Sequence, residues 1–125
     1  MHKKARPVNR AYFITATDTN AGKTRITAGL ARALRGSGVS TGVMKPVETG
    51  CELRNGALVP VDAIALKEAA GSVDPLDLIN PYRFAPPLAP SIASRMAGMD
   101  ISLSRIGECF QEIAGRHAVT LVEGV

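Results

Sequence analysis

The sequence predicts an α/β protein with three layers, in which helices cover both faces of a mostly parallel sheet. The first observation is an apolar run at residues 12–14, followed by a turn of small residues and a Gly-Lys-Thr triplet at residues 22–24. A helical pattern over residues 26–34 comes directly after it. The second observation is that two later apolar runs, residues 39–47 and 118–122, also have the character of strands. Strands that alternate with helices are typical of a parallel sheet.

The Gly-Lys-Thr triplet indicates a phosphate-binding loop, so the predicted fold resembles that of P-loop NTPases. A strand, a phosphate-sized loop and a helix that begins on this triplet form the layout of the motif. Backbone N–H groups of such a loop, together with the helix N-terminus, create an anion site before any side chain acts. Lys23 would reach the β- and γ-phosphates, and the Thr24 hydroxyl would hold Mg²⁺.

The spacing of this loop departs from the usual pattern. The motif normally has four residues between its first Gly and Gly-Lys-Thr, but the residue at that distance is Thr17. A longer variant, with one more residue between, would begin at Ala16, which requires a negative φ there. A chance triplet is the alternative, but the strand before it and the helix after it favour phosphate binding.

Length and charge limit the number of domains and the kind of partner. A chain of 125 residues allows one domain at most. We expect residues 1–10 to be a disordered basic tail and residues 11–125 to be a partial P-loop domain, incomplete at its C-terminus. Four of the 15 basic residues lie in that tail, and without them the basic and acidic residues balance. No basic stripe interleaved with aromatic residues follows, so we expect no nucleic-acid partner.

Apolar residues before the loop are too few for a signal-peptide core or a membrane span, so we expect a cytoplasmic protein without a membrane partner. Cys51 and Cys109 lie far apart, without the spacing of a metal site, which favours buried or incidental thiols. His2 and His117 have no partner at helical spacing, and we interpret neither as a metal ligand.

Lys45 lies near the end of the second predicted strand, residues 39–47, which Pro46 closes. In open α/β sheets ligands bind at the carboxyl ends of the strands. Lys45 is therefore either an ordinary solvated lysine or a site residue on the same edge as the phosphate loop. Residues 48–60 follow as a predicted loop, with a turn at Asn55 and Gly56.

Asp62 comes at the start of a short helical pattern that ends at Gly71. Its carboxylate could cap this helix, or it could face a metal ion, and the sequence alone slightly favours the cap. Four prolines between residues 78 and 90 predict an extended path without regular structure.

Two further helices and a strand complete the pattern. We expect a short helix over residues 91–97 and a longer one that ends at Gly115, because Leu103, Ile106, Phe110 and Ile113 form an apolar stripe. Glu123 then follows the apolar strand at 118–122, where a second metal-binding carboxylate would belong. Because only three strands are predicted, we expect the final strand to leave an open edge of the buried type.

Taken in order, these motifs resemble the dethiobiotin synthetase family. The similar segments are the long-spaced loop at 16–24, the Lys-Pro-Val-Glu-Thr-Gly segment at 45–50, the Asp-Ala-Ile-Ala-Leu segment at 62–66, and Val-Glu-Gly at 122–124. The segment Asn-Pro-Tyr-Arg-Phe at 80–84, with its proline-rich continuation, supports the match at 62–66. Each motif is modest alone, whereas the ordered set is specific.

The resemblance implies roles for individual residues. Lys45 and Lys23 would be catalytic, and Thr49 would contact the diamine substrate. Mg²⁺ would lie among Thr24, Asp62 and Glu123. ATP would be bound by Thr19, Asn20, Ala21, Gly22, Lys23, Thr24, Arg25, Asp62 and Glu123. Two departures are Ala16, where the family has Gly, and Asn20, where an acid is often found.

The family resemblance also implies a reaction. An amine of 7,8-diaminononanoate takes up CO₂ (from bicarbonate) as a carbamate, which attacks the γ-phosphate of ATP to give a carbamic–phosphoric anhydride. The second amine closes the ring and expels phosphate, which yields dethiobiotin for biotin synthesis. Because two anions must meet, the reaction needs concentrated positive charge. The family works as a homodimer of chains nearly twice as long as this one.

Three alternatives stay open. A cobyrinic acid amide-forming synthase has a similar domain, but it is long and carries a glutaminase domain. A nucleotide-switch ATPase of the ParA/MinD kind has a second lysine four residues before Gly-Lys-Thr, where this chain has Asp18. The third is an inactive fragment of the synthetase, and we expect weak or no turnover from these residues alone.

Overall fold

The structure is a computed structural model that describes residues 9–15 and 22–125. The predicted loop residues Thr19, Asn20 and Ala21 lie outside this range, as do Ala16 and most of the expected tail. The strands are β1 Arg10–Ile14, β2 Thr41–Met44, β3 Val47–Glu48, β4 Glu52–Arg54, β5 Ala57–Val59, β6 Tyr82–Arg83 and β7 Val119–Glu123. The helices are α1 Gly22–Gly36, α2 Val61–Ala70, α3 Leu76–Ile79, α4 Pro90–Ala97 and α5 Leu103–Arg116.

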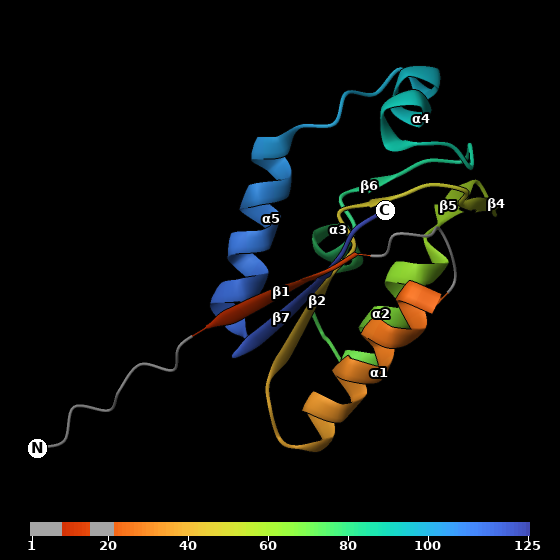
Figure 1. The fold of residues 1–125 in the computed structure, drawn as a ribbon. Helices are drawn as coiled ribbons and strands as arrows, with labels where there is room; N and C mark the ends of the chain where they lie inside the picture. Colours follow the sequence, from red (N-terminus) through yellow and green to blue (C-terminus); the bar gives the residue numbers. More distant parts are fainter. Residues whose placement is uncertain (1–8, 16–21) are drawn as a thin grey trace, which may run out of the picture.

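The central sheet has the strand order β1-β7-β2, and both pairs are parallel. Helix α5 covers one face of this sheet, while α1 and α2 cover the other (Figure 1). The predicted three-layer α/β/α architecture with a mostly parallel sheet is therefore confirmed. The expectation that the final strand leaves an open edge is wrong, because β7 pairs with β1 on one side and with β2 on the other.

The main core lies between the central sheet and its helices and is aliphatic. Small residues at the α1–α2 contact, such as Ala31 and Ala63, are fully buried and let the two helices pack closely. On the opposite face, Ile113 of α5 packs in the same core as Leu121 and Val122 of β7. This packing fixes α1 and α2 over the sheet and thereby places their N-termini near the carboxyl ends of the strands.

Pro46 divides the single strand predicted at residues 39–47 into two. β2 ends at Met44, and β3 pairs not with the central sheet but with β6, in parallel. Proline has no N–H to donate to a sheet ladder, which explains why pairing changes at this point. The chain therefore leaves the central sheet immediately after Met44, at Lys45.

The segments predicted to be irregular contain short strands. Residues 52–59 form the β4–β5 hairpin, in which Asn55 and Gly56 both have positive φ, 51° and 80°. Such angles are typical of a two-residue hairpin turn. The proline-rich stretch is also not wholly irregular, since β6 forms within it and the rings of Tyr82 and Phe84 stack, with centroids 6.4 Å apart.

A polar network closes the amino end of the central sheet. The Asp74 carboxylate is almost fully buried, and its Oδ1 accepts a hydrogen bond from Arg116 Nη1 at 2.8 Å. Its Oδ2 lies 2.7 Å from His117 Nε2, within hydrogen-bond distance. His117 Nδ1 lies 2.9 Å from the hydroxyl oxygen of Ser40, which immediately precedes β2. The network joins the loop after α2 to the end of α5 and to the start of β2.

No helix among the described residues is long and apolar enough to cross a membrane.

Candidate functional site

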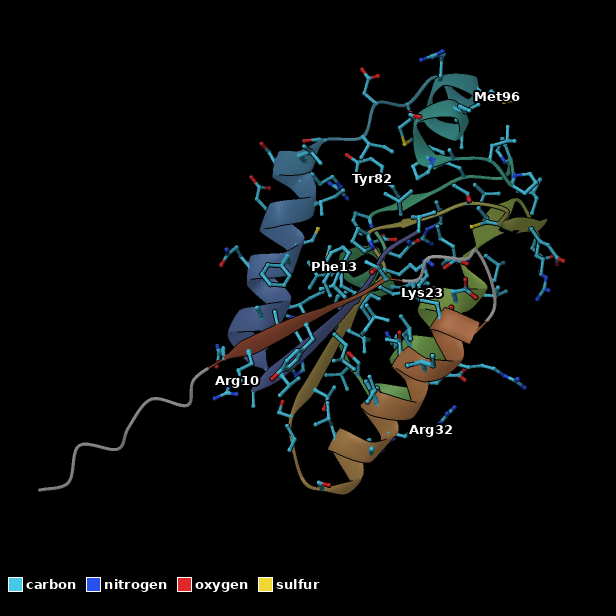
Figure 2. All side chains as sticks on the ribbon, in the orientation of Figure 1. Arg10, Phe13, Lys23, Arg32, Tyr82 and Met96 are labelled. Atoms are coloured by element: carbon cyan, nitrogen blue, oxygen red, sulfur yellow. The ribbon has the colours of Figure 1, made fainter. Side chains whose placement is uncertain are left out.

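The opposite, carboxyl end of the sheet brings together four predicted site residues from four parts of the chain. Thr24 lies in the first turn of α1, Lys45 follows β2, Asp62 lies in the first turn of α2, and Glu123 ends β7. Lys23 precedes Thr24 on α1, beside the ends of the central strands (Figure 2). Parallel strands end at one edge of a sheet, which is why residues so far apart in sequence meet here.

Glu123 is the buried carboxylate of this cluster, and its side chain is fully inaccessible to solvent. Its Oε1 accepts a 2.7 Å hydrogen bond from the Thr24 hydroxyl. Its Oε2 has no hydrogen-bond donor among the described residues and lies 3.7 Å from Lys45 Nζ. Buried charges are costly unless they are paired, so the free lone pairs of Oε2 are suited to accept a cation.

Lys45 is only 5% exposed, and its ammonium group lies between two acids. Nζ is 3.7 Å from a carboxylate oxygen of Asp62 and equally far from Glu123 Oε2, and it donates to the carbonyl oxygen of Gly124 at 3.4 Å. The main chain of Lys45 is also held, because its N–H donates to Ile79 O and its carbonyl accepts from Asn80 Nδ2 at 2.7 Å. Lys45 is therefore not an ordinary solvated lysine, and it stays a predicted site residue.

Asp62 does not cap α2. The helix begins at Val61, and no side chain caps it from the preceding residue, Pro60. The Asp62 carboxylate instead points toward Lys45, and it remains partly open to solvent, with 42% of its side chain exposed. The cap interpretation that the sequence slightly favoured is therefore wrong, because another acid supplies the cap.

That acid is Glu48, which the sequence analysis missed as a functional residue. Its two carboxylate oxygens accept hydrogen bonds from the backbone N–H groups of Asp62 at 3.1 Å and Ala63 at 2.9 Å. Burial raises the pKa of Glu48, and these two hydrogen bonds offset the rise only in part. No local signal could have found this contact, since Glu48 lies 14 residues before Asp62 in the sequence.

The remaining predicted site residues have fewer contacts with the cluster of Thr24, Lys45, Asp62 and Glu123. Burial and the nearby charge of Lys45 lower the pKa of Lys23, while Glu123 and Asp62 act in the opposite direction. Gly22 begins α1, and an added Cβ there would meet nothing within 4 Å. Arg25 is exposed on α1, and Thr49 is partly buried just after β3.

The side chains of this site fit a magnesium ion. Hydroxyl and carboxylate oxygens from Thr24, Asp62 and Glu123 are hard donors, and Glu123 Oε2 has lone pairs to offer. No cluster of three or more His, Cys, Asp or Glu side chains able to hold a metal occurs in the described ranges. A site of two carboxylates agrees with this finding, because Mg²⁺ in nucleotide sites typically binds one or two carboxylates, with substrate phosphates and water completing its shell.

Comparisons with known proteins agree with the motifs. Residues 10–125 match a protein family described as AAA domain, which is of the P-loop NTPase type. A protein of Anaeromyxobacter dehalogenans named ATP-dependent dethiobiotin synthetase BioD is 45% identical over 115 residues, which are 92% of this chain and 50% of that protein. Proteins with the same name from Pseudomonas aeruginosa and Thermodesulfovibrio yellowstonii are 44% and 40% identical over 91% of the chain.

The chain spans about half the length of these curated relatives. The resemblance to dethiobiotin synthetases predicted from the four motifs is confirmed by the names of the relatives. Since the family match covers almost the whole sequence, the chain belongs to the AAA domain family.

Proposed function

We propose that this chain is the nucleotide-binding part of a dethiobiotin synthetase, an ATP- and Mg²⁺-dependent ligase of biotin biosynthesis. The enzyme would join CO₂ to 7,8-diaminononanoate and close the ring to dethiobiotin. The observation that carries this proposal is the buried Lys45–Glu123 pair, with Asp62 and Thr24, at the N-terminus of a helix that begins on Gly-Lys-Thr. The names of the relatives support an ATP-dependent ligase whose product is dethiobiotin, and the motif resemblance supplies the diamine substrate.

In this proposal the first turn of α1 binds the phosphates. Its free N–H groups point out of the helix end and favour an anion there. Lys23 adds a positive charge next to them, and its lowered pKa reflects burial and the nearby Lys45. Thr19, Asn20, Ala21, Gly22 and Arg25 would complete the ATP contacts.

Thr24, Asp62 and Glu123 would hold Mg²⁺, which when bound supplies positive charge to the phosphates. The Thr24–Glu123 hydrogen bond already fixes the orientation of two of these groups. The partly exposed Asp62 carboxylate can follow a ligand, whereas Glu123 is held by burial and by its hydrogen bond to Thr24.

Lys45 would act on the reacting groups. A carbamate that approaches the γ-phosphate brings two anions together, and the Lys45 ammonium group lies on the edge where they would meet. The reaction would pass through the carbamate and the carbamic–phosphoric anhydride, with positioning and charge neutralisation as the main contribution of the protein. Thr49 would contact the diamine. We also propose that the whole enzyme is a cytoplasmic homodimer.

The test measures ADP release with Mg-ATP and bicarbonate, with and without 7,8-diaminononanoate, and the mass of the product. The relative from Anaeromyxobacter dehalogenans serves as the positive control. Calorimetry with Mg-ATP measures nucleotide binding by this chain separately from turnover.

Diamine-dependent ADP release together with a product of the mass of dethiobiotin is the expected result for the synthetase. Binding of Mg-ATP without turnover would support the nucleotide site and would limit the activity to the longer protein. ADP release at the same rate with and without the diamine would contradict the synthetase proposal and favour a nucleotide-switch ATPase. Absence of Mg-ATP binding would overturn the proposal for this chain.

A further inference from the structure

Glu48 is a buried acid for which the proposed reaction has no use. It ends β3 and is only 3% exposed, so its carboxylate is removed from bulk water. Both of its oxygens are engaged, Oε2 by the N–H of Asp62 at 3.1 Å and Oε1 by the N–H of Ala63 at 2.9 Å. A buried carboxylate that accepts two hydrogen bonds has a defined position, and it restrains the backbone groups that donate to it.

What Glu48 contacts is the first turn of α2. The N–H groups at the start of a helix have no partner within the helix and normally bind a side chain of the residue just before it. In α2 that residue is Pro60, which offers no such side chain. Glu48, at the end of β3, supplies the acceptor oxygens instead. Its negative charge also interacts favourably with the positive end of the helix dipole.

The main chain of Glu48 is fixed as firmly as its carboxylate. β3 pairs with β6 in the register Glu48 to Arg83, and Phe84 N–H donates to the carbonyl oxygen of Glu48 at 2.8 Å. Lys45 lies just before β3, and its carbonyl oxygen is held by Asn80. The segment that carries Lys45 and Glu48 is therefore anchored, and the Glu48 carboxylate joins the backbone of the first turn of α2 to it.

We propose that Glu48 is a positioning residue that sets the distance between Lys45 and Asp62 by clamping the first turn of α2. Asp62 donates its N–H to Glu48 and faces Lys45 Nζ with its carboxylate, 3.7 Å away. A small rotation of this turn would carry the carboxylate away from Lys45. The inference rests on the proposed roles of Lys45 and Asp62, and it adds the residue that holds them in register.

A purely structural cap would stabilise α2 without affecting the reactivity of the Lys45 amine. The test therefore compares substitutions at two buried carboxylates, Glu48 and Asp74. Glu48→Gln keeps the size of the side chain but has one acceptor oxygen, so one helix N–H would face an NH₂ group. Asp74→Asn is the matched control, because Asp74 is as buried as Glu48 but lies at the opposite end of the sheet. Both variants are expected to lower the stability of the fold.

The deciding measurement is the rate at which acetic anhydride modifies the Lys45 amine, followed by mass spectrometry without nucleotide or metal. Loss of the clamp releases Asp62, so Glu48→Gln should raise the Lys45 rate roughly threefold or more through local opening, whereas Asp74→Asn should leave it unchanged. An unchanged Lys45 rate in Glu48→Gln, or an equal rise in both variants, would overturn the proposal.

Two further measurements keep the proposal testable if Glu48→Gln does not fold. Glu48→Asp keeps the charge but is one methylene shorter, so it should give a rise between the wild type and Glu48→Gln. In the wild type, the amide hydrogens of Asp62 and Ala63 should exchange as slowly as those in the middle of α2, and fast exchange would contradict the clamp. None of these readouts requires ATP, so a chain that fails to bind Mg-ATP would refute the proposed function and still leave the Glu48 result decisive.

Discussion

Asp74 at the amino end of the central sheet and Glu123 at the carboxyl end are both buried, but among the described residues only Asp74 has partners for both of its oxygens. Asp74 is 2% exposed, and its two oxygens have partners in Arg116, His117 and Ser72. At the carboxyl end Glu123 is fully buried, and its Oε2 lacks a hydrogen-bond donor among the described residues. The nearest cation, Lys45 Nζ, stays 3.7 Å away.

The difference in hydrogen-bond partners indicates different roles for the Asp74 and Glu123 carboxylates. A buried carboxylate whose lone pairs are all engaged stabilises one arrangement of the chain and has nothing left to offer a ligand. A carboxylate with a free oxygen next to a lysine keeps the capacity to bind a cation or to respond to an approaching anion. We therefore interpret the Asp74 network as a structural tie and the Glu123 cluster as the site.

Glu48 and Asp74 both have partners for their two oxygens, but their pKa values shift in opposite directions because the partners differ. Burial raises the pKa of Glu48, and the hydrogen bonds that its oxygens accept from the described residues come from backbone N–H groups. Burial also acts to raise the pKa of Asp74, but hydrogen bonds from Arg116 and His117 outweigh it and lower that pKa. Side-chain hydrogen bonds from Arg116 and His117 thus make the difference between a carboxyl group whose pKa is raised and one whose pKa is lowered.

The largest expected effect is on turnover at the carboxyl end. In a protein that shows diamine-dependent ADP release, Lys45→Ala should lower kcat by about 10²–10³-fold, the cost of removing one group that stabilises transition-state charge. Binding of Mg-ATP should change far less, because the helix N-terminus and Lys23 remain. Steady-state kinetics and calorimetry measure the two quantities, with Arg32→Ala, on the exposed side of α1, as the control for loss of charge. Equal losses in kcat and in ATP affinity would remove Lys45 from the catalytic role.

The second effect is on stability at the amino end. Asp74→Asn should lower the free energy of unfolding by about 2–4 kcal/mol, because it leaves a buried amide against Arg116 and His117. Urea denaturation at pH 7 measures this loss. Mg-ATP binding should be the same as in the wild type, and a change in that affinity would show that the two ends of the sheet are coupled.

A smaller loss is expected at Gly42, in β2 next to the same network. An added Cβ would lie 2.7 Å from Ile113 Cγ2 and 2.8 Å from His117 Cδ2, closer than packed atoms allow. Gly42→Ala should therefore lower the free energy of unfolding by about 1–3 kcal/mol through overpacking. Gly107→Ala on α5, where a Cβ would meet nothing within 4 Å, is the matched control in the same denaturation series. Equal stability of the two variants would contradict the close packing of β2 against α5.

The smallest effect is an opposite pH dependence of the two buried acids. The folded-state pKa of Asp74 is lowered, so its contribution to stability is present above about pH 3.9, the ordinary pKa of Asp, and is lost as the pH falls through the folded-state value. The folded-state pKa of Glu48 is raised, so proton uptake by Glu48 favours the folded state as the pH falls from that value toward about 4.3.

Urea denaturation across this pH range checks the prediction. The stability difference between the wild type and Asp74→Asn should shrink below about pH 4, whereas the difference between the wild type and Glu48→Gln should grow as the pH falls toward about 4.3. Parallel curves for the two variants would contradict the opposite pKa shifts of Asp74 and Glu48.

The sequence by itself determined the elements that create the site. An apolar run before Gly-Lys-Thr predicts β1 and the start of α1, and apolar runs that end in Lys45 and Glu123 predict site residues at strand ends. These inferences need only the period and the end of each element, which are local properties of the chain. Lys45 and Glu123 could therefore be placed at strand ends before their distances were known, whereas the site role of Asp62 was implied only by the family resemblance.

Only the tertiary structure decided which groups satisfy one another. It places β7 between β1 and β2, although β7 is the last strand in the chain, because strand order depends on how the connections cross the sheet. It also assigns the cap of α2 to Glu48 and frees Asp62 to face Lys45, a choice between two acids equally able to bind helix N–H groups. Local patterns cannot make that choice, since the energy of a buried hydrogen bond depends on which side chain the fold brings within about 3 Å.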